Sequence, residues 1–287
     1  MTLKKAAGAV GSALLYFGIY FAWQFVVGFW VGLAYEAYAL AVYGTSADIQ
    51  TMLADFSLKY AVHMTLVSNV LALITFAVLF RMRKRKLRDE VRLTKLSPAI
   101  CGICILFGAA MNIFVMVVIS SVPFPEAWWD QYNSMASAIP GTAAWISVLS
   151  TVIAAPIVEE IVLRGLFYGR LKRGMPMFAA MLISSWIFGL IHGAVIWVIY
   201  AALLGMLIAW IYEKYRSLTA AILFHFGFNL CGFALGYFES LSPVLIILSA
   251  VVSVGLFAYI QFSAPGKIEF TVPEEDKATV IGGDGEN

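Results

Sequence analysis

Long apolar stretches dominate the chain, and short polar segments separate them. A membrane-spanning helix needs roughly 20 mostly apolar residues, and the stretches have about this length. Their hydrophobic positions do not alternate with a period of two, which argues against a membrane β-barrel. The pattern therefore predicts an all-α, polytopic helical bundle with about eight transmembrane helices, near residues 6–31 (extending toward 43), 60–80, 99–122, 142–168, 176–192, 195–212, 218–235 and 243–262.

The fifth and sixth stretches are separated only by Gly193 and Ala194, so the boundary between these two helices is weakly marked. Two of the longer segments between stretches suit the membrane surface. Residues 48–56 repeat apolar side chains at helical spacing, which predicts a short helix lying on the outer membrane surface. Residues 123–132 hold two tryptophans and a tyrosine, which suit the membrane interface: Trp128, Trp129 and Tyr132.

Composition narrows the class of protein. Only 13% of the 287 residues are charged, and the mean hydropathy is +0.87. An ordinary soluble domain is about 25% charged, and so few charges could not cover a soluble surface. The composition therefore argues against a soluble enzyme, a disordered protein or a nucleic-acid binder. The three cysteines do not suggest a disulfide scaffold, and we interpret Cys101 and Cys104, inside an apolar stretch, as packing residues.

The positions of the basic residues predict the orientation in the membrane. Cytoplasmic loops carry an excess of lysine and arginine. With the N-terminus inside, all of the 19 lysines and arginines except Lys59 and Arg164 fall on the cytoplasmic side. We therefore predict a multi-pass protein of the cell membrane with both termini in the cytoplasm. The basic run 81–88 suits either anionic membrane lipids or a plain topology signal.

Charged residues interrupt the fourth apolar stretch, at residues 156–164 (Pro-Ile-Val-Glu-Glu-Ile-Val-Leu-Arg). Ionisable groups inside a membrane span are costly and indicate function by default. Glu160 and Arg164 are four residues apart, share a helix face and can pair. Glu159 lies about 100° around the helix, and Pro156 leaves a backbone carbonyl without its usual donor. A structural ion pair explains Glu160 and Arg164, but it leaves Glu159 without a partner.

Polar residues in two other stretches supply partners. His192 ends the fifth stretch, and His225 and Asn229 share a face of the seventh because they are four residues apart. A single histidine in a membrane helix is usually a packing residue, as we expect for His63. Grouping His192, His225 and Asn229 with the two glutamates satisfies all of these side chains at once. The group suits amide hydrolysis, because glutamate and histidine can deprotonate water and N–H groups can stabilise an oxyanion.

Other chemistries were compared with this set. Two histidines and a glutamate also suit zinc, so a metal site stays open at this point. However, no H-E-x-x-H occurs in the chain, and neither the G-x-S-G of rhomboid-type proteases nor the aspartate motifs of presenilin-type proteases is present. The three other familiar intramembrane protease chemistries therefore lack their residues.

The order E-E-x-x-x-R, F-x-x-x-H and H-x-x-x-N resembles the CPBP family of intramembrane proteases, which includes the type II CAAX prenyl endopeptidases (the Rce1-like enzymes) and the bacterial Abi proteins. The matching residues are Glu159, Glu160, Arg164, Phe188, His192, His225 and Asn229. Each motif alone is weak, but all three in order on consecutive apolar segments are fairly specific. The resemblance covers about residues 143–236.

The resemblance implies a role for each residue. Glu159 would activate the attacking water beside His192, and His225 and Asn229 would stabilise the oxyanion. Glu160 and Arg164 would either hold the site together or position the substrate. Phe188 is the first residue of the F-x-x-x-H motif. Family members are often described as metalloproteases, yet these residues also fit a metal-free mechanism. We favour the metal-free version, with zinc as the alternative cofactor. The substrate would be a membrane-associated protein or peptide, and a prenylated CAAX terminus is not assumed.

On this basis we divide the chain into four parts. Residues 1–140 form N-terminal transmembrane helices and outer loops, and residues 141–240 form the CPBP-like catalytic core. Residues 241–262 form the last transmembrane helix. Residues 263–287 are rich in glycine and acidic residues and predict a disordered tail.

Two other functions remain as alternatives. Buried carboxylates and histidines also occur in proton-coupled transporters, although no internal repeat supports that reading here. A non-catalytic immunity or scaffold protein is the other alternative, prompted by the basic inner loop and the acidic tail. The protease model requires Glu159 and His225 to lie at the same depth in the membrane. Counted from the predicted cytoplasmic turns near Gly174 and Ser217, however, Glu159 lies about 22 Å along its helix and His225 only about 12 Å. The turn before His225 must then lie deeper in the membrane, or its helices must be tilted.

Overall fold

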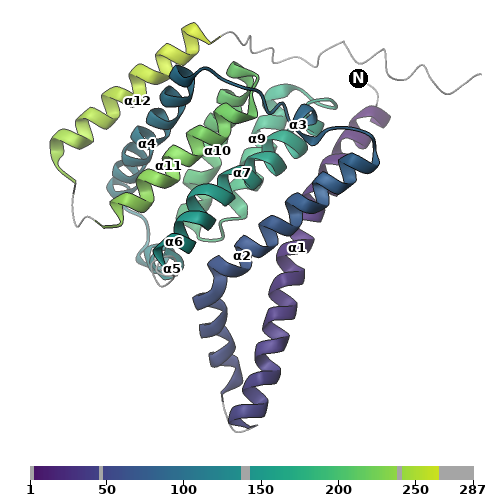
Figure 1. The fold of residues 1–287 in the computed structure, drawn as a ribbon. Coiled ribbons are helices and arrows are strands. Elements are labelled where there is room, and N and C mark those ends of the chain that lie inside the picture. Colours follow the sequence, from purple (N-terminus) through teal and green to yellow (C-terminus); the bar gives the residue numbers. More distant parts are fainter. Residues whose placement is uncertain (1–2, 45–47, 137–142, 238–240, 265–287) are drawn as a thin grey trace, which may run out of the picture.

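The computed structural model describes residues 3–44, 48–136, 143–237 and 241–264, and in these residues all regular structure is helical. The predicted all-α polytopic bundle is confirmed. Figure 1 shows the helices side by side, with a hairpin of the first two projecting from one end. The elements are α1 (Leu3–Tyr43), α2 (Ile49–Met82), α3 (Leu87–Glu90), α4 (Pro98–Ser121), α5 (Glu126–Ala136), α6 (Ala144–Ser147), η1 (Val148–Ala154), α7 (Ala155–Glu160), η2 (Ile161–Tyr168), α8 (Gly169–Leu171), α9 (Met177–Leu190), α10 (Val195–Tyr215), α11 (Leu218–Leu235) and α12 (Pro243–Ser263).

Seven helices in the described residues are long and apolar enough to cross a membrane. The fourth of them, Ala144–Leu171, is a continuous rod of α-helical and π-helical segments, α6 to α8. The one remaining predicted span, the fifth (residues 176–192), corresponds to α9, which has only 14 residues and is therefore about 21 Å long. This helix is shorter than a full span, and a short turn joins it to α10. The predicted tail beyond residue 264 lies outside the described residues.

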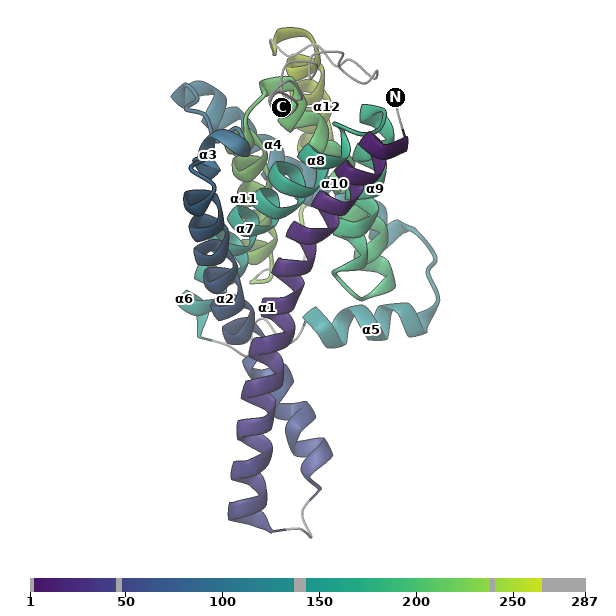
Figure 2. The same cartoon turned by 90° about the vertical axis from the view of Figure 1, so that its right-hand side faces the viewer.

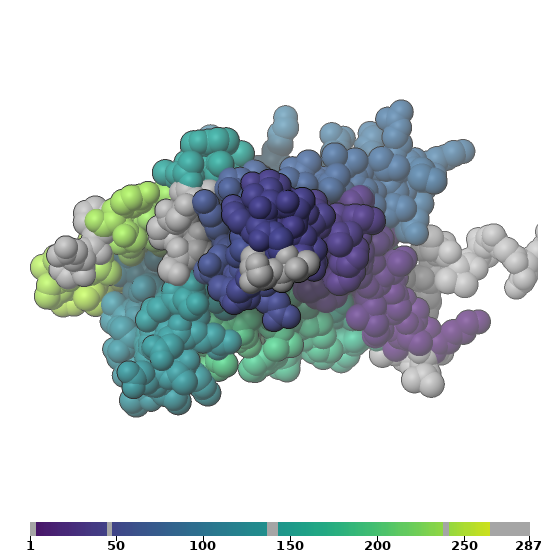
Figure 3. Space-filling model, turned by 90° about the horizontal axis from the view of Figure 1, so that it is seen from below, coloured from purple at the N-terminus to yellow at the C-terminus, as the bar shows by residue number. Residues whose placement is uncertain are grey.

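The hairpin of α1 and α2 corrects one prediction. Residues 48–56 do not form a separate surface helix, because α2 begins at Ile49 and runs without a break to Met82. Their apolar side chains face α1 instead: the rings of Phe56 and Tyr35 stack with centroids 4.0 Å apart. The predicted helical spacing is confirmed, and the apolar face packs on α1. The hairpin projects beyond the other helices, and its residues fill the middle of the face seen in Figure 3.

One end of the bundle carries a helix that runs across it. Figure 2 shows α5 lying crosswise to the long helices. Its Gln131 side chain accepts a hydrogen bond from the Val195 backbone N–H at 3.3 Å, and the Tyr132 ring meets Trp197 at 5.4 Å. The segment with the predicted interfacial aromatic residues therefore packs against the first turn of α10, next to the loop that carries His192.

At the end of the bundle opposite α5, three arginines pair with one buried carboxylate. Glu90 of α3 pairs with Arg85 at 3.2 Å, with Arg170 at 2.6 Å and with Arg173 at 2.9 Å. Two loops that were predicted to be cytoplasmic therefore meet on one side of the bundle. Part of the basic run has an internal partner and is more than a topology signal.

The segment that follows Glu90 covers the turn between α10 and α11. The Leu218 backbone N–H donates to the Arg92 carbonyl at 2.9 Å, and the Thr219 hydroxyl donates to the Thr94 carbonyl at 2.6 Å. Ser217 and Leu218 are fully buried as a result. The turn before His225 is therefore covered by another segment of the chain.

The closest helix contact in the bundle is between α4 and α11. A β-carbon added to Gly108 would overlap the Phe224 carbonyl oxygen, and one added to Gly227 would overlap the Ile105 carbonyl oxygen. Glycine on both sides lets the two backbones touch, as small residues do in membrane helix pairs. Cys104 is fully buried on α4, and Cys101 and Cys104 are both free thiols, so they are packing residues as predicted.

We expect Gly108→Ala to destabilise the protein, because the new methyl group meets backbone that cannot rotate away. Overpacking of this kind costs about 1–3 kcal/mol or more. Gly102→Ala on the same helix is the matched control, since nothing lies within 4 Å of its added β-carbon. Thermal unfolding in detergent should show a lower midpoint for Gly108→Ala only. Equal midpoints would mean that α4 and α11 are not in such close contact.

Candidate functional site

The two glutamates lie on α7, between two π-helical segments. The segment η1 precedes α7 and η2 follows it, and such π-helical segments occur frequently at functional sites. In the π-helical register, the Thr151 carbonyl would receive the N–H of residue 156, which is a proline and has none. The Asn229 side-chain amide donates to this carbonyl instead, at 2.9 Å. The carbonyl expected to be left free by Pro156 is therefore used to anchor a predicted site residue.

Glu160 and Arg164 form the predicted ion pair. The guanidinium Nη1 donates to Glu160 Oε1 at 3.1 Å, and both side chains are fully buried. The second nitrogen, Nη2, donates to the Gly205 carbonyl of α10 at 3.1 Å. The guanidinium also lies over the Phe188 ring, 4.4 Å from its centroid. The pair therefore ties the fourth span to α9 and α10, and the missing side chain of Gly205 makes room for it.

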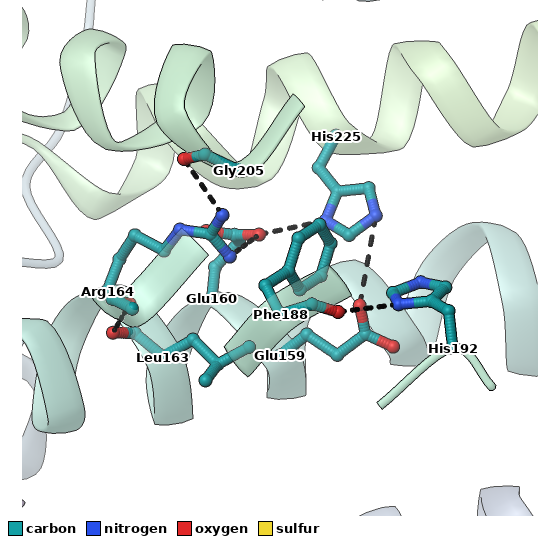
Figure 4. Close-up of polar contacts among 9 residues, drawn as sticks. Glu159, Glu160, Leu163, Arg164, Phe188, His192, Gly205 and His225 are labelled. Carbon is teal, nitrogen blue, oxygen red and sulfur yellow. Dashed lines mark hydrogen bonds and ion pairs between the residues drawn. The ribbon is translucent and has the colours of Figure 1, made fainter. Parts of the chain in front are cut away.

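His225 bridges the two glutamates. Its Nδ1 lies 2.9 Å from Glu160 Oε1, and its Nε2 lies 3.9 Å from Glu159 Oε2. Because a carboxylate accepts, Nδ1 carries a proton and donates to Glu160. The bond on Nδ1 fixes the ring so that Nε2 is directed at Glu159, as Figure 4 shows.

His192 lies just beyond the end of α9. Its Nδ1 is 2.7 Å from the Phe188 carbonyl oxygen, which can only accept, so Nδ1 carries the proton and donates. The neutral imidazole then has a lone pair on Nε2. Phe188 supports both histidines, with ring centroids 4.9 Å from His192 and 5.6 Å from His225. His192 is thus oriented to accept a proton or a hydrogen bond at Nε2.

Burial divides the site into a sealed part and an accessible part. The side chains of Glu160 and Arg164 are 0% exposed and that of His225 is 3% exposed, whereas that of Glu159 is 15% exposed. His192 and Asn229 are also half-buried. The ion pair of Glu160 and Arg164 is closed off from solvent. Glu159 is the carboxylate of the site that a small molecule such as water can reach.

The structure brings the predicted residues together. Figure 4 shows six of them with their side chains turned toward one another, from the fourth span, α9 and α11: Glu159, Glu160, Arg164, Phe188, His192 and His225. Asn229 lies one turn beyond His225 and is held by Thr151. Their catalytic roles stay predictions. Sequence reasoning missed Gly205 and Thr151, because both act through backbone carbonyls that no residue type announces.

The donor atoms were tested as a zinc site. Zinc in proteins takes three or four ligands from histidine, cysteine, aspartate or glutamate. In the part of the chain that the structure describes, no three such residues are grouped to hold a metal ion. His225 uses Nδ1 on Glu160 and His192 uses Nδ1 on a carbonyl, which leaves one nitrogen on each ring. The free Nε2 atoms are also the atoms that a metal ion would use, so the metal-free version and zinc both stay predictions.

One region of the chain is similar to a known protein family. Neither the curated proteins nor the solved structures include a match to this chain. Residues 141–231 match the family model described as type II CAAX prenyl endopeptidase Rce1-like. All seven site residues lie within this match, which leaves α1 to α5 and α12 outside it. The resemblance drawn from the three motifs is therefore confirmed over residues 141–231 of this polytopic membrane protein, which are similar to the Rce1-like, type II CAAX prenyl endopeptidase family.

Proposed function

We propose that the protein is an intramembrane endopeptidase that uses Glu159 to activate water. One observation carries the proposal: an accessible carboxylate, Glu159, lies beside two histidines whose rings are fixed by bonds on Nδ1. The buried pair of Glu160 and Arg164 holds this arrangement from behind. Peptide-bond hydrolysis requires a general base that can reach the attacking water, and hydrogen-bond donors that stabilise the oxyanion.

The proposed reaction has two proton transfers. Glu159 takes a proton from a water held between its carboxylate and the free Nε2 of His192, and the water oxygen attacks the carbonyl carbon of the scissile peptide bond. The second N–H of the Asn229 amide and the protonated Nε2 of His225 donate to the oxyanion that forms. Glu159 then gives its proton to the leaving nitrogen as the C–N bond breaks. The products are a carboxylic acid and an amine.

The substrate and the setting belong to the same proposal. The substrate is a membrane-associated protein or peptide, and a prenylated peptide with a CAAX-type C-terminus is the first to test because of the family match. The protein lies in the cell membrane with both termini in the cytoplasm, and the basic residues of segment 81–88 that lack an internal partner face anionic lipids. The reaction proceeds on the side chains alone, without a metal.

The histidines provide the test of this proposal. We expect His192→Ala and His225→Ala to lower cleavage of a membrane-linked peptide in proteoliposomes by about 10²-fold or more, since acid–base groups contribute this much. His63→Ala is the matched control and should cleave normally, because His63 lies on α2 against Tyr60, outside the site. Excess chelator should leave wild-type cleavage unchanged.

Two results would contradict the proposal. Normal cleavage by His192→Ala and His225→Ala would remove these residues from the mechanism. Loss of wild-type cleavage with chelator, restored by added zinc, would replace the metal-free version with a metal-dependent one.

A further inference from the structure

The turn that carries His192 lies between two helices and outside both of them. The helix α9 ends at Leu190, and Gly193 has a φ of +78°, in the left-handed region that favours glycine. Within the turn, the His192 N–H donates to the Gly189 carbonyl and the Ala194 N–H donates to the His192 carbonyl, both at 3.0 Å. Because His192 is not part of a regular helix, its position depends on what packs against this turn.

The helix α5 packs against this turn with one of its faces. The first N–H groups of a helix have no partner within it, and Gln131 Oε1 of α5 accepts the first N–H of α10, that of Val195, at 3.3 Å. The Met135 side chain covers Gly193, since a β-carbon added to this glycine would lie 3.2 Å from Met135 Cε. Gln131 and Met135 are four residues apart and share a helix face. This face of the crosswise helix α5 (Figure 2) therefore holds the turn in place.

A ring of α10 connects α5 to the imidazole itself. The Trp197 ring lies 6.4 Å from the His192 ring, measured between centroids, with 75° between the ring planes. The same Trp197 ring meets Tyr132 of α5 at 5.4 Å and 67°. Edge-to-face arrangements of this kind are a preferred geometry of aromatic pairs. Aromatic contacts thus run from α5 through Trp197 to the histidine that is proposed to hold the attacking water.

The imidazole needs such a contact, because one hydrogen bond does not fix the orientation of a ring. The bond from His192 Nδ1 to the Phe188 carbonyl, 2.7 Å long, fixes one corner, and the ring can still swing about it. The Phe188 ring limits this motion from α9, with centroids 4.9 Å apart, and the Trp197 ring limits it from α10. The free Nε2 of His192 then keeps one direction.

Packing of α5 on the bundle would by itself explain a pair of rings such as Tyr132 and Trp197. It does not explain why the contacts of Gln131, Tyr132 and Met135 all fall on residues 193–197, directly after His192. A hydrogen bond, an aromatic pair and a methionine side chain converge on the segment that fixes the place of one proposed site residue. The arrangement suits a support for His192.

We propose that Trp197 is a positioning residue of the active site, which keeps the His192 imidazole directed at the attacking water and is itself held by α5. This inference rests on the proposed function. The helix α5 (Glu126–Ala136) lies outside the family match, residues 141–231. It contributes no atom to the reaction and acts through the turn and through Trp197.

Steady-state cleavage of a membrane-linked peptide by the full-length protein in proteoliposomes tests this inference. Trp197→Leu removes the ring, and we expect kcat to fall about tenfold, the upper end of what one aromatic pair contributes. KM should stay within about twofold, because His192 is proposed to act on the water and not in substrate binding. Tyr132→Leu removes only the support of Trp197 and should lower kcat about threefold. Tyr132→Phe keeps the ring and should have the wild-type kcat.

Two amides of α5 provide a matched pair of variants. Gln131→Ala removes the acceptor of the Val195 N–H and should lower kcat about threefold, within the range of one hydrogen bond. Asn133→Ala removes an amide about 200° further around the same helix and should leave kcat and KM unchanged. Both side chains are exposed, so neither substitution should prevent folding.

The outcomes separate the inference from the proposed function. If the wild type cleaves the peptide and Trp197→Leu has the wild-type kcat, Trp197 has no positioning role, and the proposed function is unaffected. A raised KM with an unchanged kcat would make Trp197 a substrate contact and would also overturn the inference. If Trp197→Leu does not fold, Tyr132→Leu and Gln131→Ala decide: a kcat below that of Asn133→Ala supports the inference, and an equal kcat overturns it. A wild type that cleaves no membrane-linked peptide overturns the proposed function and this inference with it.

Discussion

Replacing Arg164 with methionine is expected to destabilise the folded protein by about 3–5 kcal/mol, the cost of leaving one partner of a buried ion pair alone. Glu160 would lose its hydrogen bond to the guanidinium Nη1 and would keep only the imidazole of His225. The Gly205 carbonyl and the Phe188 ring would also lose their cationic neighbour. Thermal unfolding in detergent, followed by circular dichroism, measures the effect.

A double variant separates charge from packing. Glu160→Leu combined with Arg164→Met removes both charges and keeps similar volumes, and such replacements are often neutral or stabilising. We expect the double variant to unfold close to the wild-type temperature and to be inactive. If Arg164→Met alone unfolds like the wild type, the pair is not a support of the site. If the double variant is as unstable as Arg164→Met, the loss comes from packing and not from the unpaired carboxylate.

Hydropathy alone predicts which segments of this sequence form membrane-spanning helices. Seven of the predicted spans are present because a long apolar stretch has few other solutions in a membrane. Hydropathy does not report what an apolar face packs against. For this reason the pattern of residues 48–56 predicts a surface helix, whereas the structure has residues 49–56 in α2. It also does not show that Glu90 collects arginines from two loops, because those contacts join residues far apart in the sequence.

The site was predictable because charged groups are rare in membrane helices. Glu159, Glu160 and Arg164 were found by their cost in an apolar stretch, and the histidines by the absence of other partners. The same search overlooked Gly205, since its contact with Arg164 is made by a backbone carbonyl that no residue type announces. The π-helical segments were also missed, because they follow from tertiary contacts such as that of Asn229 with Thr151 and not from local propensity.

Glu159→Gln is expected to lower cleavage of a membrane-linked peptide by about 10²–10⁴-fold, the usual contribution of a general base. The amide has nearly the shape of the carboxylate, but it cannot accept a proton from water. Stability should change by less than about 1 kcal/mol, as for substitutions outside buried networks, because the Glu159 side chain is partly exposed and the bond of His225 to Glu160 remains. The rate in proteoliposomes and the unfolding midpoint in detergent are measured on the same preparation.

Two matched variants show that this loss belongs to the base. Glu36→Gln removes the same charge from α1 at an exposed position outside the site and should cleave like the wild type. Glu160→Gln should lose both activity and stability, because it leaves Arg164 buried without a carboxylate. A Glu159→Gln protein that cleaves within about tenfold of the wild type would rule out Glu159 as the base, since a general base contributes more than this. Equal stability losses in Glu159→Gln and Glu160→Gln would contradict the division of the site into a catalytic carboxylate and a supporting one.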